Sequence, residues 1–255
     1  EHYMLKEIHE QPRSLTDTLG AWLDLAHGKF RLDSAAVSKK TTKAAQEFSH
    51  EDLVKAFDGA TMIHIVACGT AAHAGYYGQQ MIEKWAKIPA RAELASEFRY
   101  REPVLRATDV GLVVSQSGET ADTLAAVKLM KQAGMRVFAV CNVRDSSIPR
   151  ECDAVFYTIA GIEIGVASTK AFTTQLAVLA VIAGAIASAR GTIDAALERK
   201  WVEALGHLPE VCRHYLEQSK EVEKVAKKYA GKKGFLFLGR GPYFPIALEG
   251  ALKLK

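Results

Sequence analysis

Short apolar runs alternate with longer amphipathic stretches through the middle of the chain. The runs have the length of buried strands and lie at 61–67, 91–95, 110–114, 136–141 and 154–159. The stretches between them carry the periodicity of helices. This alternation predicts βαβ units, and therefore an α/β fold with three layers, αβα, around a parallel sheet that is covered on both faces.

The same pattern divides the chain into four parts. We predict a lead-in segment at 1–45 that packs on the domain, a first α/β subdomain at 46–191, two polar-faced connecting helices at 192–230, and the beginning of a second subdomain at 231–255. The last part repeats the order of apolar strand, here at 235–238, glycine turn and helix. Because the chain begins in a polar stretch and ends inside a helical pattern, we expect both ends to be cuts within a longer protein.

Composition narrows the classes of function. The net charge is +4 and the basic residues are scattered, which argues against a nucleic-acid partner. The apolar stretch 171–188 has only marginal length for a bilayer, so we expect a buried helix and no membrane partner. The 4 cysteines form no C-x-x-C pair and favour the cytoplasm, and the 8 histidines show no ligand spacing. We therefore expect neither a metal nor another cofactor.

The sharpest local motif follows the predicted strand at 110–114. Ser115, Ser117 and Thr120 supply hydroxyl groups where the next helix presents free amides and its positive dipole end. Gly118 lets the backbone approach a ligand closely. This set suits a phosphate dianion. The alternative is a helix cap with its turn, which uses the same residue types.

Three further places are candidates. Gly69 and Thr70 end the first strand at the ligand edge of the sheet, where an ordinary turn is the alternative. Ser168 could offer a hydroxyl to a sugar or serve only as the N-cap of the helix at 171–188. Glu249 and Lys253 share a helix face, either as an exposed ion pair or as a lysine that forms a Schiff base with its supporting carboxylate.

Several long phrases carry a family resemblance. The stretches at 2–12, 95–101, 115–124, 163–175 and 238–255 resemble the family of glutamine–fructose-6-phosphate transaminases (isomerizing). The resemblance implies two SIS subdomains of flavodoxin-like fold, a phosphosugar ligand, a homodimer, and a glutaminase domain that lies outside this chain. It also implies conversion of fructose 6-phosphate and ammonia into glucosamine 6-phosphate. The alternative function is a non-catalytic SIS module that binds a phosphosugar.

The resemblance also implies roles for individual residues. Four positions match the motif that grips the phosphate: Ser115, Gln116, Ser117 and Thr120. Three match positions beside the sugar: Thr70, Val166 and Ser168. Lys253 matches the lysine that forms an imine with the open ketose, and Glu249 matches a glutamate of the same helix.

Two departures follow from the same alignment of motifs. The family's first turn usually reads C-G-T-S, whereas Ala71 replaces the serine here, so one hydroxyl for the phosphate is missing. The family's main proton-transfer base is a glutamate that would fall one residue beyond Lys255. We therefore expect these residues alone to bind a phosphosugar weakly and to turn over little.

Overall fold

A mostly parallel sheet forms the centre of the protein. The computed structural model describes residues 2–33, 36–37 and 49–255. Within that part of the chain the strand order is β3-β8-β7-β6-β4-β5, all parallel except β3, which pairs antiparallel with β8. The parallel sheet is confirmed, and the antiparallel edge strand is an addition that the apolar runs did not indicate. The strands are β3 (Ala36–Val37), β4 (Ile63–Ala67), β5 (Ala90–Leu94), β6 (Val110–Ser115), β7 (Arg136–Cys141) and β8 (Ala154–Tyr157).

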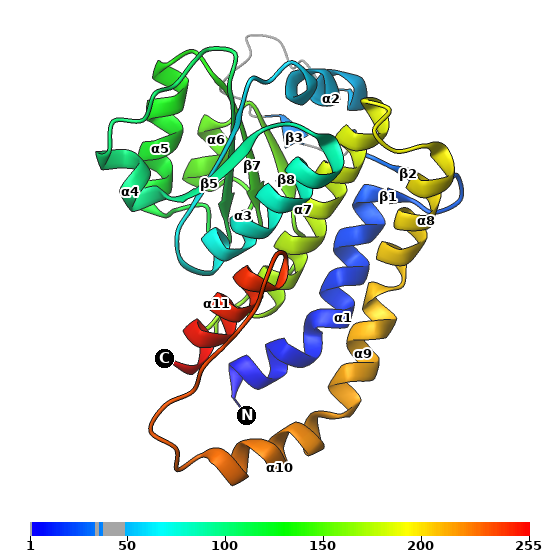
Figure 1. Cartoon of the computed structure of the whole chain (residues 1–255), viewed down its shortest axis with the longest axis vertical. Coiled ribbons are helices and arrows are strands. Elements are labelled where there is room, and N and C mark those ends of the chain that lie inside the picture. Colours follow the sequence, from blue (N-terminus) through cyan, green and yellow to red (C-terminus); the bar gives the residue numbers. More distant parts are fainter. Residues whose placement is uncertain (1, 34–35, 38–48) are drawn as a thin grey trace.

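Helices cover both faces of this sheet (Figure 1). Successive side chains of a strand point to opposite faces, so one strand feeds two cores. In β6, Leu112 and Val114 belong to the core under α3 and α7, whereas Val113 packs with α4 and α5. The predicted αβα layering is therefore confirmed. The helices of the two layers are α2 (His50–Asp58), α3 (Gly69–Met81) with its π-helical end η1 (Ile82–Ala86), and α7 (Lys170–Ala189) on one face, and α4 (Ala95–Tyr100), α5 (Ala121–Gln132) and α6 (Ser147–Glu151) on the other.

Helix α7 is the buried core helix of the first layer. By length and composition it could cross a membrane, but 83% of its most apolar window is buried inside the protein. It packs against α1, α3 and η1. A helix that is apolar all round and enclosed by other elements is typical of a core. The expectation of a buried helix at 171–188 is confirmed.

The N-terminal segment packs along this core helix. Helix α1 (Tyr3–Trp22) lies against α7 and is followed by a short hairpin, β1 (Leu23–Asp24) and β2 (Lys29–Phe30). The expectation that the lead-in packs on the domain is confirmed for this helix. The predicted boundary at 45/46 lies outside the described residues.

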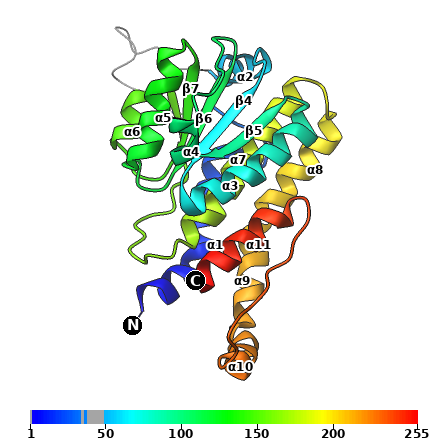
Figure 2. The ribbon, with the colours of Figure 1, turned by 60° about the vertical axis from the view of Figure 1, so that its left-hand side comes forward.

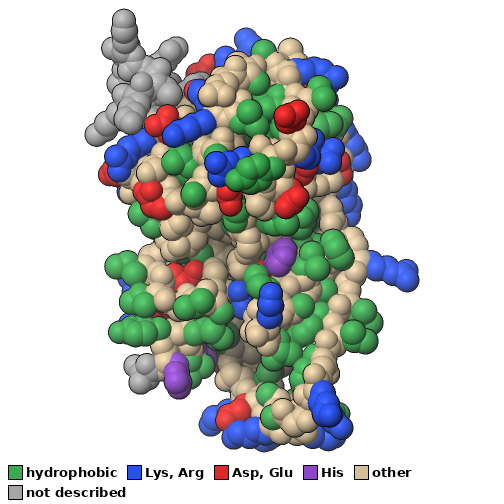
Figure 3. Space-filling model, turned by 90° about the vertical axis from the view of Figure 1, so that its left-hand side faces the viewer, with side chains coloured by type: hydrophobic (Ala, Val, Ile, Leu, Met, Phe, Trp, Pro, Cys, Tyr) green, Lys and Arg blue, Asp and Glu red, His purple; other side chains and the backbone are tan. Residues whose placement is uncertain are grey.

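The connecting region contains three helices where the sequence pattern predicted two. They are α8 (Ala195–Gly206), α9 (Leu208–Glu217) and α10 (Ser219–Tyr229). Pro209 stands in the first turn of α9, a position where proline is tolerated because that backbone amide needs no helical partner. Helix α10 lies at the end farthest from the sheet (Figures 1 and 2), where lysine and arginine side chains gather (Figure 3).

The predicted strand at 235–238 is wrong. The segment is irregular, and Leu236 and Leu238 are 91% and 89% exposed. A strand needs a neighbour to pair with, and no described strand pairs with this one. Apolar side chains therefore lie open on the lower half of the face in Figure 3. Helix α11 (Tyr243–Leu254) forms after the glycine turn as predicted, and it packs on α3 (Figure 2).

Candidate functional site

A cleft of about 240 Å³ opens at the carboxyl ends of β4 and β6. The chain leaves β4 toward β5 on one side and returns to β6 on the other, so the strand order reverses between these two strands. Such a switch point leaves a crevice outside the strand ends, and ligands of open α/β sheets bind there. All seven residues predicted to bind the substrate line this one cleft: Thr70, Ser115, Gln116, Ser117, Thr120, Val166 and Ser168.

The turn after β6 has a conformation that requires glycine. Gly118 has φ +68°, in the left-handed region. A Cβ atom at this position would stand 1.9 Å from Ser146 Oγ and 3.0 Å from Cys141 Sγ. The Gly118 carbonyl accepts a hydrogen bond from the Ile148 amide at 2.9 Å. The turn is therefore fixed against α6 from behind, and its front faces the cleft.

The serine hydroxyls of this turn are oriented to donate. Ser115 Oγ accepts from the Gly118 amide at 3.0 Å, and Ser117 Oγ accepts from the Glu119 amide at 3.3 Å. A hydroxyl carries one hydrogen besides its two lone pairs. Among the described residues neither hydroxyl donates to a protein acceptor. Both hydrogens are thus available to an anion in the cleft.

Two helix N-termini point at the same space. Helix α3 begins at Gly69 directly after β4, and α5 begins after its N-cap Thr120. Neither N-cap side chain forms a capping hydrogen bond in the described part of the chain, so the first amides of both helices stay open. Ala71 lines the cleft as well, at the position that the resemblance implies for a serine. Free amides, dipole ends and hydroxyls together are the groups that suit a phosphate without a cation.

The loop between β8 and α7 forms the opposite wall. Val166 is fully exposed at the cleft. Ser168 does not cap α7, so the N-cap alternative is wrong: its hydroxyl donates to Glu163 Oε2 at 2.8 Å. Glu163 takes over the cap, because its Oε1 accepts from the Thr169 amide at 2.8 Å and from the Ala171 amide at 3.3 Å. With its hydrogen engaged, Ser168 offers lone pairs to a ligand hydroxyl.

The predicted catalytic pair lies beside the α3 side of the cleft. Lys253 Nζ is 2.6 Å from Glu249 Oε1 and 3.2 Å from Thr70 Oγ1, and Thr70 itself lines the cleft. Glu249 also accepts from the Thr70 hydroxyl at 2.9 Å and pairs with His73 Nδ1 at 2.7 Å. The pair is therefore no exposed surface bridge, because Glu249 is buried and joins α11 to α3.

The charge of Glu249 is set by two opposing causes. Burial acts to raise the pKa of its carboxyl group. Hydrogen bonds from His73, Lys253 and Thr70 favour the ionised form and outweigh that burial, so the pKa of Glu249 lies below its ordinary value. Glu249 is thus a carboxylate at neutral pH, and it accepts a hydrogen bond from the amine of Lys253.

Two residues of the site escaped the sequence reasoning. His73 stands one turn after Thr70 on α3, so spacing on a helix face was the available signal. Gln175 on α7 lines the cleft, is 1% exposed, and its Oε1 has no hydrogen-bond partner in the described structure. A buried acceptor without a partner is costly, and a cleft that receives a ligand is one place where such a cost is tolerated. No sequence pattern marked Gln175.

Comparison with known proteins decides the family. The family model described as the SIS domain matches residues 57–185, just over half of the chain. The chain belongs to the SIS domain family. The match runs from the end of α2 to α7 and includes the β4 and β6 turns and the β8–α7 loop, so this SIS domain contributes every predicted substrate-binding residue.

The similarity to whole proteins covers the entire chain and not only the SIS domain. Glutamine–fructose-6-phosphate aminotransferases (isomerizing) from Mesorhizobium japonicum and Mycolicibacterium paratuberculosis are 44% and 46% identical over all of it. The C-terminal domain of glucosamine-fructose-6-phosphate aminotransferase from Francisella tularensis superposes with a TM-score of 0.89 at 41% identity, covering 100% of this chain and 67% of that one. The predicted resemblance is confirmed. The chain spans only 39% and 38% of the length of these two sequence relatives.

Proposed function

We propose that the cleft binds fructose 6-phosphate and that the chain is the phosphosugar-isomerase part of a glutamine–fructose-6-phosphate aminotransferase. The phosphate lies against the turn at 115–120, where hydroxyl hydrogens and helix amides converge. The sugar extends toward Ser168 and Thr70, so that its carbonyl carbon approaches Lys253. The names of the relatives support this assignment.

One observation carries the proposal. The amine of Lys253 lies 3.2 Å from the hydroxyl of Thr70, a residue that lines the cleft next to the phosphate turn. A module that only bound the phosphosugar would need no amine there. The contact therefore favours the catalytic function over a non-catalytic binding module.

The chemistry follows from this arrangement. The neutral amine of Lys253 adds to C2 of the open ketose, and loss of water leaves an imine. Glu249, at 2.6 Å, is the nearest acceptor for the proton that the amine must lose first. Ammonia then displaces the lysine. Transfer of one proton from C1 to C2, and of the O1 hydroxyl proton to the imine nitrogen, gives glucosamine 6-phosphate. The phosphate serves as the anchor that orients the reacting carbons.

Other features of the whole enzyme belong to the same proposal. A glutaminase domain elsewhere in the protein would supply the ammonia, two isomerase parts would form a homodimer, and the enzyme would work in the cytoplasm. The relatives are more than twice as long as this chain, which leaves room for such a domain. All four cysteines are free thiols, which suits a reducing compartment.

Trapping of the imine tests the proposal. Fructose 6-phosphate and sodium borohydride are added to the chain, and the site of the reduced adduct is mapped by peptide mass spectrometry. We expect the adduct on Lys253, none in Lys253→Met, and an unchanged yield in the neighbouring control Lys255→Met. An adduct that persists in Lys253→Met would overturn the assignment of the amine.

Calorimetry tests the anchor separately. Fructose 6-phosphate should bind the chain and fructose should not. Ser117→Ala should weaken phosphosugar binding about fivefold to tenfold, since it removes one hydrogen bond to a charged group. Equal affinity in wild type and Ser117→Ala would contradict the anchor. Robust isomerisation by these 255 residues alone would contradict the expectation that the proton-transfer base is a glutamate one residue beyond Lys255.

A further inference from the structure

A row of polar side chains on α1 faces the β8–α7 connection. Members of the row recur every three or four residues and therefore share one face of the helix. All but Glu10, which is partly exposed, are buried, although polar residues on a lead-in helix would ordinarily face solvent. The members that contact the connection are Glu7, Glu10, Ser14, Thr18 and Trp22.

The contacts at the C-terminal end of this row fix the start of the connection. Trp22 Nε1 donates to the Tyr157 carbonyl at 2.9 Å. The Thr18 hydroxyl bonds to the Thr158 carbonyl. Ser14 Oγ donates to the Ala160 carbonyl at 3.2 Å. These bonds give partners to backbone carbonyls at and just after the end of β8, where the ladder of the sheet stops.

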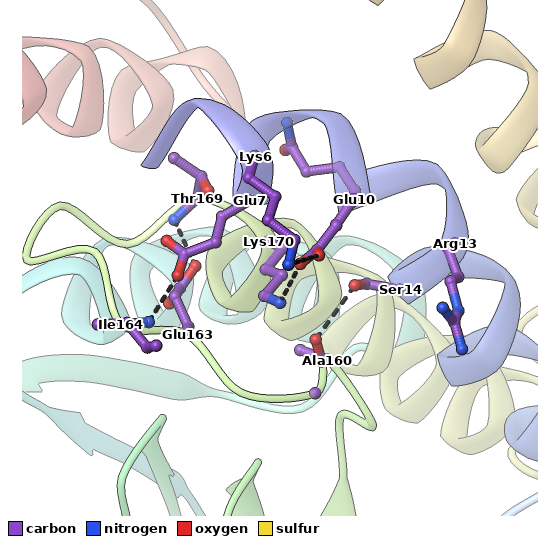
Figure 4. Close-up of polar contacts among 12 residues, drawn as sticks. Lys6, Glu7, Glu10, Arg13, Ser14, Ala160, Glu163, Ile164, Thr169 and Lys170 are labelled. Carbon is purple, nitrogen blue, oxygen red and sulfur yellow. Dashed lines mark hydrogen bonds and ion pairs between the residues drawn. The ribbon is translucent and has the colours of Figure 1, made fainter. Parts of the chain in front are cut away.

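Glu7 and Glu10 hold the part of the connection that reaches the cleft (Figure 4). Glu7 Oε1 accepts from the Ile164 amide at 2.6 Å and from the Gly165 amide at 3.1 Å. Glu10 Oε2 pairs with Lys170 Nζ at 2.6 Å. Lys170 is 3% exposed and Glu7 is 3% exposed, so both charges are buried, while Glu10, the partner of Lys170, is partly exposed. Bonds to a buried charge are stronger than those between neutral groups.

These anchors lie on both sides of the cleft wall. Glu7 holds the backbone at Gly165, immediately before Val166, and Glu10 holds Lys170, two residues after Ser168. A Cβ atom at Gly165 would stand 2.5 Å from Glu7 Oε2, so a side chain there would displace the carboxylate from its bonds to the loop. The fit between helix and loop is therefore specific at the residues that flank the predicted sugar contacts.

We propose that α1 is a positioning element for the cleft, and that Glu7 is a positioning residue that holds Val166 and Ser168 against the sugar. The proposal rests on the proposed function for the identity of the ligand. Glu7 acts through the loop backbone and touches no substrate. The phosphate turn at 115–120 is held against α6 instead, so it does not depend on Glu7.

Calorimetry on the full chain with fructose 6-phosphate and inorganic phosphate tests whether Glu7 supports the sugar side of the cleft but not the phosphate turn. In Glu7→Ala, fructose 6-phosphate should bind about tenfold more weakly, because two charge-assisted bonds to the loop are lost. Inorganic phosphate should bind with unchanged affinity. Glu7→Gln keeps one acceptor oxygen and should restore fructose 6-phosphate affinity to within about threefold of wild type. Asp17→Ala removes an exposed ion pair with Arg13 on the same helix and should change neither affinity.

Hydrogen exchange separates failure of this inference from failure of the proposed function. The amides of Ile164 and Gly165 should lose protection in Glu7→Ala and keep it in Asp17→Ala, whatever sugar the cleft prefers. If wild type binds inorganic phosphate but no fructose 6-phosphate, the proposed function fails and the exchange result still decides about Glu7. Unchanged protection in Glu7→Ala, or an equal loss of both ligands, would overturn the positioning role.

Discussion

Glu249 Oε2 lies 2.7 Å from Nδ1 of His73, a contact between residues 176 positions apart in the chain. It joins α11 to α3, and so it brings the amine of Lys253 to the cleft that the first subdomain forms. The placement of Lys253, the proposed catalytic lysine, therefore depends on the charge of a buried carboxylate on its own helix.

The first prediction concerns pH. The pKa of Glu249 is lower in the folded chain than its ordinary value of 4.5, despite burial, because three hydrogen bonds favour the carboxylate. Such a group stabilises the folded form above the unfolded pKa, and that contribution is lost as the pH falls through the folded pKa. Docking of α11 on α3 should therefore weaken below about pH 4.5. Hydrogen exchange of the α11 amides, corrected for intrinsic rates, measures the effect.

The matched variant is Glu249→Gln, which cannot ionise. Its α11 protection should be lower than that of wild type at neutral pH and should not fall further in the acid range. A profile in Glu249→Gln with the same acid dependence as wild type would show that another group controls the docking.

The second prediction concerns the phosphate turn. Gly118→Ala places a methyl group 1.9 Å from Ser146 Oγ at a residue with φ +68°, so the turn must move. We expect phosphosugar binding to fall more than tenfold and the free energy of unfolding to fall by about 2 kcal/mol or more. Calorimetry and urea unfolding measure the two effects.

Gly134→Ala is the control for backbone strain alone. Gly134 has φ +77°, but the nearest atom to an added Cβ is 3.5 Å away, and the residue follows the far end of α5. It should cost about 1 kcal/mol of stability and leave phosphosugar affinity unchanged. Equal effects of the two substitutions on affinity would argue against a special role of the β6 turn.

The third prediction concerns the residue that departs from the family's motif. Ala71 lines the cleft in the first turn of α3. Ala71→Ser adds one hydroxyl donor near the open amides, so fructose 6-phosphate should bind about threefold to tenfold more tightly. Calorimetry checks the gain, with Ala72→Ser as the control because Ala72 is buried and does not line the cleft. No gain in Ala71→Ser would place the phosphate away from α3.

The sheet and the cleft were predictable because local pattern controls both. Apolar runs of strand length gave β4 and β6, and parallel strands deliver their carboxyl ends to one edge. Thr70 and Ser115 therefore had to lie at the same edge of the sheet, and the pairing of β4 with β6 brings them together. The resemblance then supplied Val166 and Lys253, whose positions depend on long-range packing that spacing does not encode.

The errors have long-range causes as well. The run at 235–238 has the composition of a strand, but strand formation needs a partner that pattern alone does not supply. Serine is common at N-caps, but the carboxylate of Glu163 accepts from the amide at the start of α7 in place of Ser168. No sequence motif marked Gln175 as a site residue. Its role becomes visible only when the structure shows that this buried glutamine lines the cleft.

The last prediction concerns Gln175, whose buried Oε1 has no partner among the described residues although the side chain lines the cleft. An unpaired buried acceptor destabilises the empty chain, whereas in the complex it would accept from a sugar hydroxyl. Gln175→Leu should therefore raise the free energy of unfolding of the empty chain by about 1 kcal/mol and weaken fructose 6-phosphate binding about tenfold. Urea unfolding and calorimetry measure changes of opposite sign.

An exposed glutamine provides the comparison for this substitution. Gln132→Leu at the end of α5 adds the same apolar group outside the cleft, so it should change neither stability nor affinity by much. A structural role of Gln175 would make Gln175→Leu lose stability and affinity together. A gain in stability with full retention of affinity would mean that the ligand leaves this acceptor unused, and the sugar would then have to lie on the other side of the cleft, nearer Thr120.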